Sequence, residues 1–439
     1  MPPIMIQLLP NEVILHIAAS VDSPRDLSAL SRVNRRFHHT LDDFLYLQSA
    51  LRWGNLALLW AAELGITTIA DKALSAGGDI NAKEALHRKS IIPRRLRCHR
   101  DKYKTDRCNH GGNTPLMLAM DAGHYEMVKY LLAVEGRDIT SKNSCGFHPL
   151  QAAVFLGDIA MVELLLQLED VNPELPGWEL MTPLMTAANK GHVDVVKLLL
   201  DRPDVDPSKG NGYTKNSMFL VAWHGYGEIA KLLLDAGASP DRYFDVFPLE
   251  MAVNRGYTDV VRHLLDAGAV PESASPAGLL HDAARGNHLG VFKIILERFP
   301  EIDVNFKNSS RQTALWYAAR YGQEEMVSLL LSHDGIEVNG DYAIGIPVET
   351  IRRLRRDQLL EYPEVSEPTV LIVAAMQGHI NIVRMLVDVE GIDLDSVNVL
   401  GETAMEAAYA YGHNEIAEVI RAAMEAKSTR GRETHSFRD

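Results

Sequence analysis

The amino-acid sequence predicts an all-α protein in which a small N-terminal three-helix bundle precedes a solenoid of helix–turn–helix units. Three observations lead to this fold class. A glycine-centred segment recurs along most of the chain, repeatedly at a spacing of 34 residues. Each copy has the apolar spacing of two short helices. Residues 8–37, by contrast, have no second copy. Units of this kind are expected to stack, because none buries its apolar face alone.

The composition is ordinary for a globular chain but acidic in balance. The 439 residues are 46% hydrophobic and 23% charged, with a formal net charge of −14. This charge argues against general binding to nucleic acid or anionic membranes and would suit a basic partner. Three cysteines are too few for a disulfide framework, and no secretion signal or membrane-spanning stretch is apparent. The sequence therefore predicts an intracellular protein of the cytoplasm, the nucleus or both.

The unrepeated N-terminal segment has the pattern of three short helices. Pro10 opens the first, Ser23 and Pro24 restart a second, and "TLDDFLYLQSALRW" continues as a third. So small a bundle carries more apolar surface than it can bury internally, which suggests a surface for a partner.

Residues 5–50 resemble an F-box, although Asn34 stands where many F-boxes carry cysteine. The resemblance implies docking onto the SKP-family adaptor of a cullin-based (SCF-type) ubiquitin ligase. The alternative is that these helices only cap the open end of the first repeat. The residues at F-box positions include the expected adaptor contacts Leu9, Pro10, Glu12, Ile14, Ile17, Leu27, Leu30, Val33 and Phe37, together with Val13 and Arg36.

One repeat, "TPLMTAANKGHVDVVKLLL" at residues 182–200, illustrates the unit. Thr182 caps a first helix, Pro183 suits its first turn, and Gly191 supplies the left-handed residue that ends it. A second helix with an apolar face follows. The corresponding turn positions are Gly65, Gly123, Gly157, Gly191, Gly225, Gly256, Asn287, Gly322, Gly378 and Gly412.

The spacing of these turns also predicts two insertions. Gly65 and Gly123 are 58 residues apart and Gly322 and Gly378 are 56 apart, which equals one repeat plus an insertion in each case. Asn287 fits the series because asparagine tolerates the left-handed conformation.

Three copies, "NTPLMLAMDAGHYEMVKYLL", "MTPLMTAANKGHVDVVKLLL" and "QTALWYAARYGQEEMVSLLL", resemble ankyrin repeats. The resemblance covers about ten units over residues 55–424. An F-box before ankyrin repeats is similar to a large family of filamentous fungi. It implies a non-catalytic adaptor without cofactors. The expected parts are an F-box at 5–50, a degenerate first repeat at 55–82, insertions at 83–108 and 335–366, repeats at 109–334 and 367–424, and a disordered tail at 425–439.

In an ankyrin array the residues just before each turn glycine and the connecting fingers form a concave binding face. Aromatic residues and arginine at these places favour a protein or peptide target over a small molecule. The alternative for each ring is packing against an adjacent repeat. The candidates are Phe155, Trp178, Tyr213, Trp223, His224, Tyr243, Phe244, Arg255, Arg320, Tyr321 and Tyr411.

Other signals are weaker. The basic stretch 87–110 could mark a nuclear regulator, but a solvated loop is the better interpretation, and nucleic acid is not expected as a partner. The spacing of Cys98, His99, Cys108 and His110 is not standard for zinc, so no metal is expected. We find none of the short catalytic motifs. The histidines that follow turn glycines are expected to be structural; they are His124, His192, His379 and His413.

Overall fold

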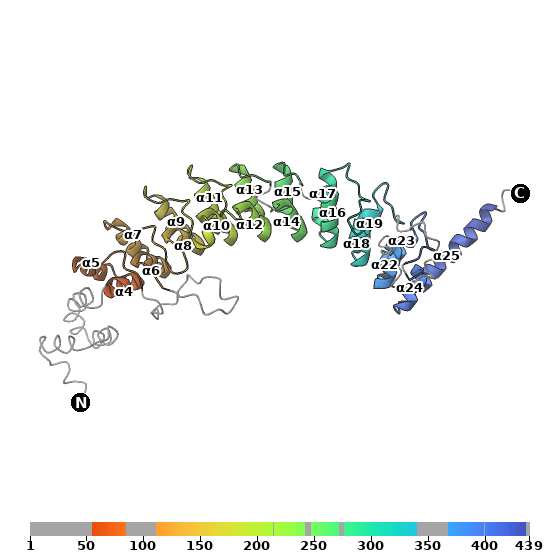
Figure 1. The fold of residues 1–439 in the computed structure, drawn as a ribbon, viewed down its shortest axis with the longest axis horizontal. Helices are drawn as coiled ribbons and strands as arrows, with labels where there is room; N and C mark the ends of the chain where they lie inside the picture. The colour runs from red at the N-terminus through yellow and green to blue at the C-terminus, as the bar shows by residue number, and fades with distance from the viewer. Residues whose placement is uncertain are drawn as a thin grey trace, which may run out of the picture. The chain divides into compact units, whose positions relative to one another are not determined.

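The computed structural model describes residues 55–84, 111–213, 215–241, 247–271, 276–339, 368–398 and 400–435 (Figure 1). The predicted F-box at 5–50, Cys98 to His110 of the basic stretch, and the candidates Tyr243 and Phe244 lie outside these residues. The chain divides into two compact units. Unit 1 comprises Met1–Leu220 with Asp235–Ala238, and unit 2 comprises Val221–Leu234 with Ser239–Asp439.

Unit 1 is a succession of helix pairs, each with a first helix that leads through a tight turn into a second. A 3-10 turn, η3 (Trp178–Leu180), lies in the finger before α10. The pairs are α4 (Leu56–Leu64) with α5 (Thr67–Ser75), α6 (Pro115–Ala122) with α7 (Tyr125–Ala133), α8 (Pro149–Leu156) with α9 (Ile159–Leu166), and α10 (Pro183–Lys190) with α11 (Val193–Leu200).

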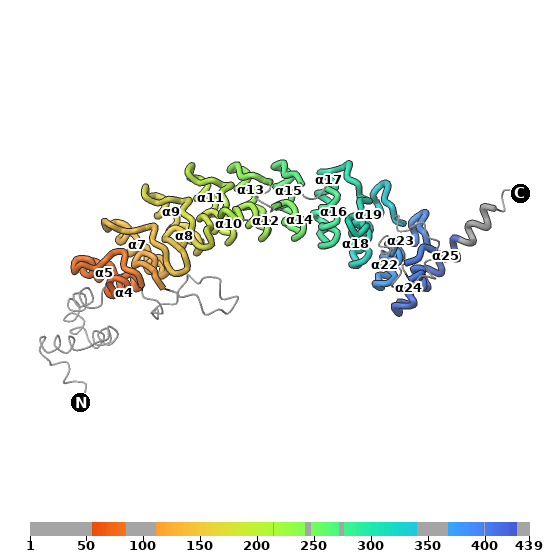
Figure 2. Tube along the Cα trace, in the orientation of Figure 1, coloured from red at the N-terminus to blue at the C-terminus, as the bar shows by residue number. Residues whose placement is uncertain are grey.

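Helices α12 (Ser217–His224) and α13 (Gly227–Asp235) form the pair at which the two units divide. Unit 2 continues the same pattern, and Figure 2 follows the path of the chain through each pair. Its pairs are α14 (Pro248–Arg255) with α15 (Thr258–Asp266), α16 (Pro276–Arg285) with α17 (Leu289–Arg298), α18 (Ala314–Arg320) with α19 (Glu324–Leu331), α22 (Val370–Gln377) with α23 (Ile380–Val387), and α24 (Ala404–Ala410) with α25 (Asn414–His435).

The caps follow from local sequence. The Oγ1 atom of Thr182 accepts a hydrogen bond from the backbone N–H of Met185 at 3.2 Å, as predicted. The same threonine cap recurs in four other repeats. At the opposite end of a first helix, Asn287 has φ 58°, which confirms that asparagine occupies the left-handed position. The other capping threonines are Thr114, Thr313, Thr369 and Thr403.

The core lies between successive pairs within each unit. First helices are apolar on almost every side; in α10, for example, Leu184, Met185 and Ala187 are fully buried. Small residues such as Ala187 let neighbouring first helices approach closely, and α8 contacts both α6 and α10. The described residues contain no strand, only two isolated bridges. These findings confirm the all-α array of helix–turn–helix units.

The stack continues across both long gaps between turn positions. In unit 1, α4 packs directly on α6. In unit 2, α18 packs on α22, and the indole Nε1 of Trp316 donates a hydrogen bond to the carbonyl oxygen of Pro368 at 3.0 Å. His379 adds a bond from its Nε2 to the carbonyl oxygen of Arg320 at 3.1 Å. The repeats that flank each of these two long gaps therefore pack directly on one another.

Candidate functional site

Several exposed aromatic and arginine side chains of unit 2 lie at or next to the C-terminal ends of its first helices. Arg255, Arg285 and Arg320 are the last residues of α14, α16 and α18, three helices that contact one another in succession. All three side chains are exposed. We call Arg255, Arg285 and Arg320 the arginine row.

The first arginine of the row lies over an aromatic ring. The guanidinium carbon of Arg255 is 3.7 Å from the ring centroid of Trp223, and the indole itself is 40% exposed. Stacking uses the face of the guanidinium and leaves the N–H groups along its edge available to an acceptor. Next to this pair, the rings of His224 and Tyr226 stack with centroids 5.5 Å apart.

Arg320, the last arginine of the row, also lies over an indole ring. The guanidinium of Arg320 lies 5.1 Å from the ring centroid of Trp316, one helical turn earlier. Trp316 is 2% exposed and is fixed by its bond to Pro368, so it offers Arg320 a rigid platform. Tyr321, 53% exposed, stacks in the same way on Tyr317, with centroids 6.3 Å apart.

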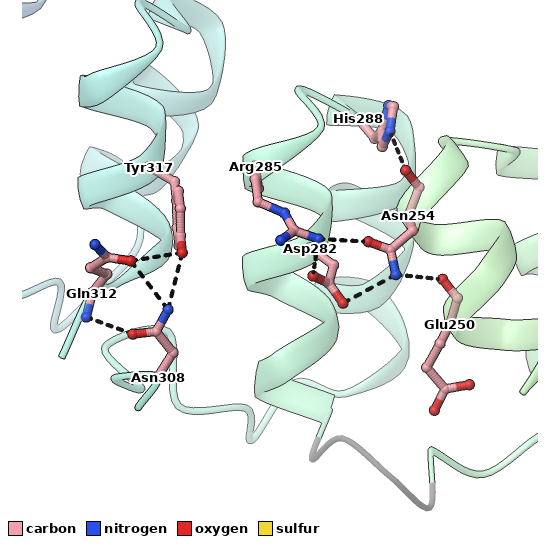
Figure 3. A network of polar contacts seen from close by, with 8 residues as sticks. All are labelled: Glu250, Asn254, Asp282, Arg285, His288, Asn308, Gln312 and Tyr317. Carbon is pink, nitrogen blue, oxygen red and sulfur yellow. Dashed lines mark hydrogen bonds and ion pairs between the residues drawn. The ribbon is translucent and has the colours of Figure 1, made fainter. Parts of the chain in front are cut away.

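Tyr317 is itself anchored by a polar cluster at the start of α18. Its hydroxyl donates to Oε1 of Gln312 at 2.7 Å and accepts from Nδ2 of Asn308 at 3.1 Å (Figure 3). Nearby, the buried ring of His281 contacts Tyr317 and bonds the carbonyl oxygen of Phe306 at 2.8 Å. Burial, the main cause, lowers the pKa of His281 and so favours the neutral form of this ring.

The middle arginine belongs to a bridge between two repeats. Nη2 of Arg285 donates to Oδ1 of Asn254 and to Oδ1 of Asp282, both at 3.1 Å. Nδ2 of Asn254 in turn donates to the carbonyl oxygen of Glu250 at 3.1 Å and reaches Oδ2 of Asp282 at 3.4 Å (Figure 3). The charge of Arg285 is therefore partly neutralised, unlike that of Arg255 or Arg320, for which the described residues provide no carboxylate partner.

The repeats that carry this surface match a known family. The family model described as ankyrin repeats (3 copies) matches residues 15–142, 86–176, 150–243, 248–341 and 349–429. The chain belongs to the ankyrin-repeat family. Ankyrin-repeat proteins are generally non-catalytic binding scaffolds, so the repeats imply protein partners. The first matched segment begins at residue 15 and so overlaps the range predicted as an F-box.

The ankyrin surface of unit 1 differs from that of unit 2. Phe155 is half-buried between Phe147, with ring centroids 4.9 Å apart, and Lys190, whose Nζ lies 3.9 Å from the Phe155 centroid. Desolvation lowers the pKa of Lys190. Trp178 is also half-buried and packs on the cluster of Met181, Met185 and Leu220. For these two rings the structure supports the alternative of packing against their surroundings.

The finger that contains Trp178 presents other side chains. Glu179 and Leu180 both have positive φ, 50° and 57°, a conformation that favours glycine. The side chain of Leu180 is 47% exposed, and the neighbouring finger exposes 66% of Tyr213. The Glu179 carboxylate pairs with Lys215 at 3.4 Å. Tyr213 is thus accessible, whereas the exposed apolar residue of the preceding finger is Leu180 and not Trp178.

The remaining predicted positions are distributed along the repeats. Tyr411 is 53% exposed next to Tyr409, whose hydroxyl donates to Glu418 at 2.9 Å. Sequence reasoning missed Arg285, Trp316 and Lys190. Arg285 does not precede a turn glycine, because this repeat turns at Asn287; the signal that marks it is its place two residues before Asn287.

Two further observations bear on the class of site. Among the described residues, no group of three or more His, Cys, Asp or Glu side chains is arranged to hold a metal ion. Within the same ranges, no helix is long and apolar enough to cross a bilayer. Cys98, His99, Cys108 and His110, whose spacing is not standard for zinc, lie outside the described ranges.

Proposed function

We propose that this ankyrin-repeat protein is a substrate receptor of a cullin-based ubiquitin ligase. In this proposal, residues 5–50 dock onto the SKP-family adaptor, the ankyrin repeats capture the target, and ubiquitin transfer takes place on other subunits. The chain itself supplies no catalytic group.

The observation that supports capture is the exposed surface of unit 2. Trp223, Arg255 and Tyr321 are residue types that carry binding energy at protein interfaces, and all three are exposed. Arg255 is also held by the Trp223 ring at 3.7 Å, so that ordering it on binding costs little entropy.

The link to the ligase rests on the sequence of the N-terminal segment. Leu9 and Pro10 open it, and apolar residues such as Leu27 recur at F-box positions. An ankyrin scaffold whose N-terminal helices are only a cap is the second candidate. The ankyrin match that begins at residue 15 favours this second candidate, because it counts part of the segment among the repeats.

A pull-down of purified SKP-family adaptor by the full chain separates the two candidates. The test variant combines Pro10→Ala with Leu27→Asp, and the control is Arg262→Gln, an exposed arginine of α15. Circular dichroism checks that both fold. Adaptor retained by the wild type and the control but lost by the folded double variant is the expected result. If the folded wild type retains no adaptor, the receptor proposal fails and the cap remains.

A further inference from the structure

We infer that the arginine row of unit 2 binds an extended, acidic segment of a protein partner in which two carboxylates lie about six residues apart. The inference deepens the proposed capture of a target by the ankyrin repeats and rests on that part of the proposed function. It does not depend on whether the N-terminal segment engages the adaptor.

The three arginines of the row differ in whether a carboxylate of the protein already pairs with them. Arg255 and Arg320 are exposed, and their observed contacts are with the faces of Trp223 and Trp316. Arg285 already shares its charge with Asp282. The two outer positions therefore attract an anion most strongly, and the middle position favours a neutral or hydrogen-bonding group.

Both outer arginines are held in place before any partner arrives. Each guanidinium lies over an indole face, which restricts its rotamers and leaves its in-plane N–H donors free. That fork of donors matches the two oxygens of a carboxylate. Lysine in the same place would offer a point charge without this geometry.

The spacing of the helices sets the spacing of the carboxylates. Packed helices lie about 8–10 Å apart, and α14 and α18 are separated by α16, which contacts both. The two outer arginines are therefore roughly 16–20 Å apart. An extended chain advances about 3.3 Å per residue, so five or six residues span this distance. A helical segment would need about twelve, at about 1.5 Å per residue.

The same arrangement favours a protein over a nucleic acid. A nucleic-acid strand carries a phosphate at every nucleotide, so its charge could not skip the middle position. A phosphate at the middle position would be repelled by the carboxylate of Asp282, which is bonded to Arg285. A peptide can place an uncharged residue opposite Asp282, and the net charge of −14 further disfavours a polyanion. The net charge of the whole chain suits a basic partner. The arginine row is a basic surface within this acidic chain, so the segment that it binds is expected to be acidic.

The test uses the full chain and fluorescein-labelled peptides of thirteen residues built on Gly, Ser and Ala. One peptide carries two glutamates six residues apart, and its control carries the same two glutamates side by side. Fluorescence anisotropy gives the dissociation constants. The test variant combines Arg255→Gln with Arg320→Gln. The matched control combines Arg262→Gln with Lys293→Gln, which removes the same charge from exposed positions of α15 and α17. Thermal unfolding checks that both variants are folded.

We expect the spaced peptide to bind more tightly than the adjacent one. The double-arginine variant should lose affinity for it by roughly tenfold or more, because hydrogen bonds between charged groups are lost, while the control should bind like wild type. Equal binding of the two peptides, equal weakening by the two variants, or no binding at all would overturn the inference. So would an oligouridylate RNA that binds more tightly and depends on the same arginines. Adaptor retention is measured separately, so its failure would overturn only the ligase role.

Discussion

The imidazole of His192 occupies the space next to Gly157 of the preceding ankyrin repeat. A Cβ added at Gly157 would lie 2.8 Å from Cε1 of His192, and the ring Nε2 bonds the carbonyl oxygen of Phe155 at 3.3 Å. The same contact joins His288 to Gly256 and His413 to Gly378. The three rings bond carbonyl oxygens at the ends of first helices, those of Phe155, Asn254 and Met376. This confirms the structural role predicted for His192 and His413.

This contact predicts how two glycine substitutions differ. Gly157 and Gly136 both have positive φ, 69° and 78°, but nothing lies within 4 Å of a Cβ at Gly136. We expect Gly136→Ala to lower the free energy of unfolding by about 1 kcal/mol, the cost of the left-handed conformation. Gly157→Ala should cost about 2 kcal/mol more, because His192 must move. Urea unfolding of both variants measures the difference, and equal losses would contradict the contact.

His148 predicts a pH dependence of stability. Its Nδ1 accepts the N-cap bond from the N–H of Gln151 at 3.3 Å, and its Nε2 donates to the carbonyl oxygen of Leu175 at 2.9 Å. Only the first bond needs a neutral ring, because a protonated Nδ1 cannot accept, whereas Nε2 can donate in either state. Burial, the main cause, lowers the pKa of His148 from 6.5 to about 4.

Since the unfolded chain binds this proton first, the stabilisation is complete above pH 6.5 and is lost as the pH falls from 6.5 to about 4. The loss should reach about 3 kcal/mol. His148→Thr supplies a non-titrating cap of the kind that Thr182 forms in the next repeat. Unfolding measured at pH 7 and pH 4.5 should show a smaller pH dependence in this variant than in wild type. An unchanged dependence would mean that another group is responsible.

Asn305 connects two successive fingers of unit 2. Its Nδ2 donates to the carbonyl oxygen of Gly335 at 2.8 Å, and its Oδ1 accepts from the N–H of Glu337 at 2.9 Å. We expect Asn305→Asp to destabilise the repeat by about 1 kcal/mol at pH 7, because a carboxylate cannot donate and faces a carbonyl. Hydrogen exchange at the Glu337 amide should accelerate.

The same bridge provides an internal comparison in unit 1. Asn81 makes the corresponding bonds to the carbonyl of Gly136 and the N–H of Asp138, at 2.8 and 2.7 Å. Asn81→Asp should therefore have an effect of the same sign. If neither Asn305→Asp nor Asn81→Asp changed the stability of the protein, the asparagine bridges would contribute little to it.

Substitutions at Thr182 measure how much a helix cap contributes to stability. The Thr182→Ala variant removes the bond to the Met185 N–H and should cost about 1 kcal/mol of stability. Thr182→Ser retains the hydroxyl and should recover most of this loss. If the serine variant were no more stable than the alanine variant, the threonine methyl and not the cap would explain the choice of residue.

Much of the ankyrin array could be predicted from sequence because its signals are local. Thr182 caps its helix through an N–H three residues away, and Asn287 turns the chain through its own φ. Such preferences act within a few residues and recur with the repeat, so the helix pairs and their order follow from them.

The exposure and pairing of surface side chains depend on residues that are distant in the sequence. Trp178, Trp223 and Trp316 are the same residue type, yet one is half-buried, one is exposed and one is buried. Arg285 is engaged by Asn254, 31 residues earlier in the chain. The sequence by itself determined the repeating helices, their caps and their turns. The tertiary structure decided which aromatic rings are exposed and which arginines remain available, because burial and charge pairing depend on side chains contributed by adjacent repeats.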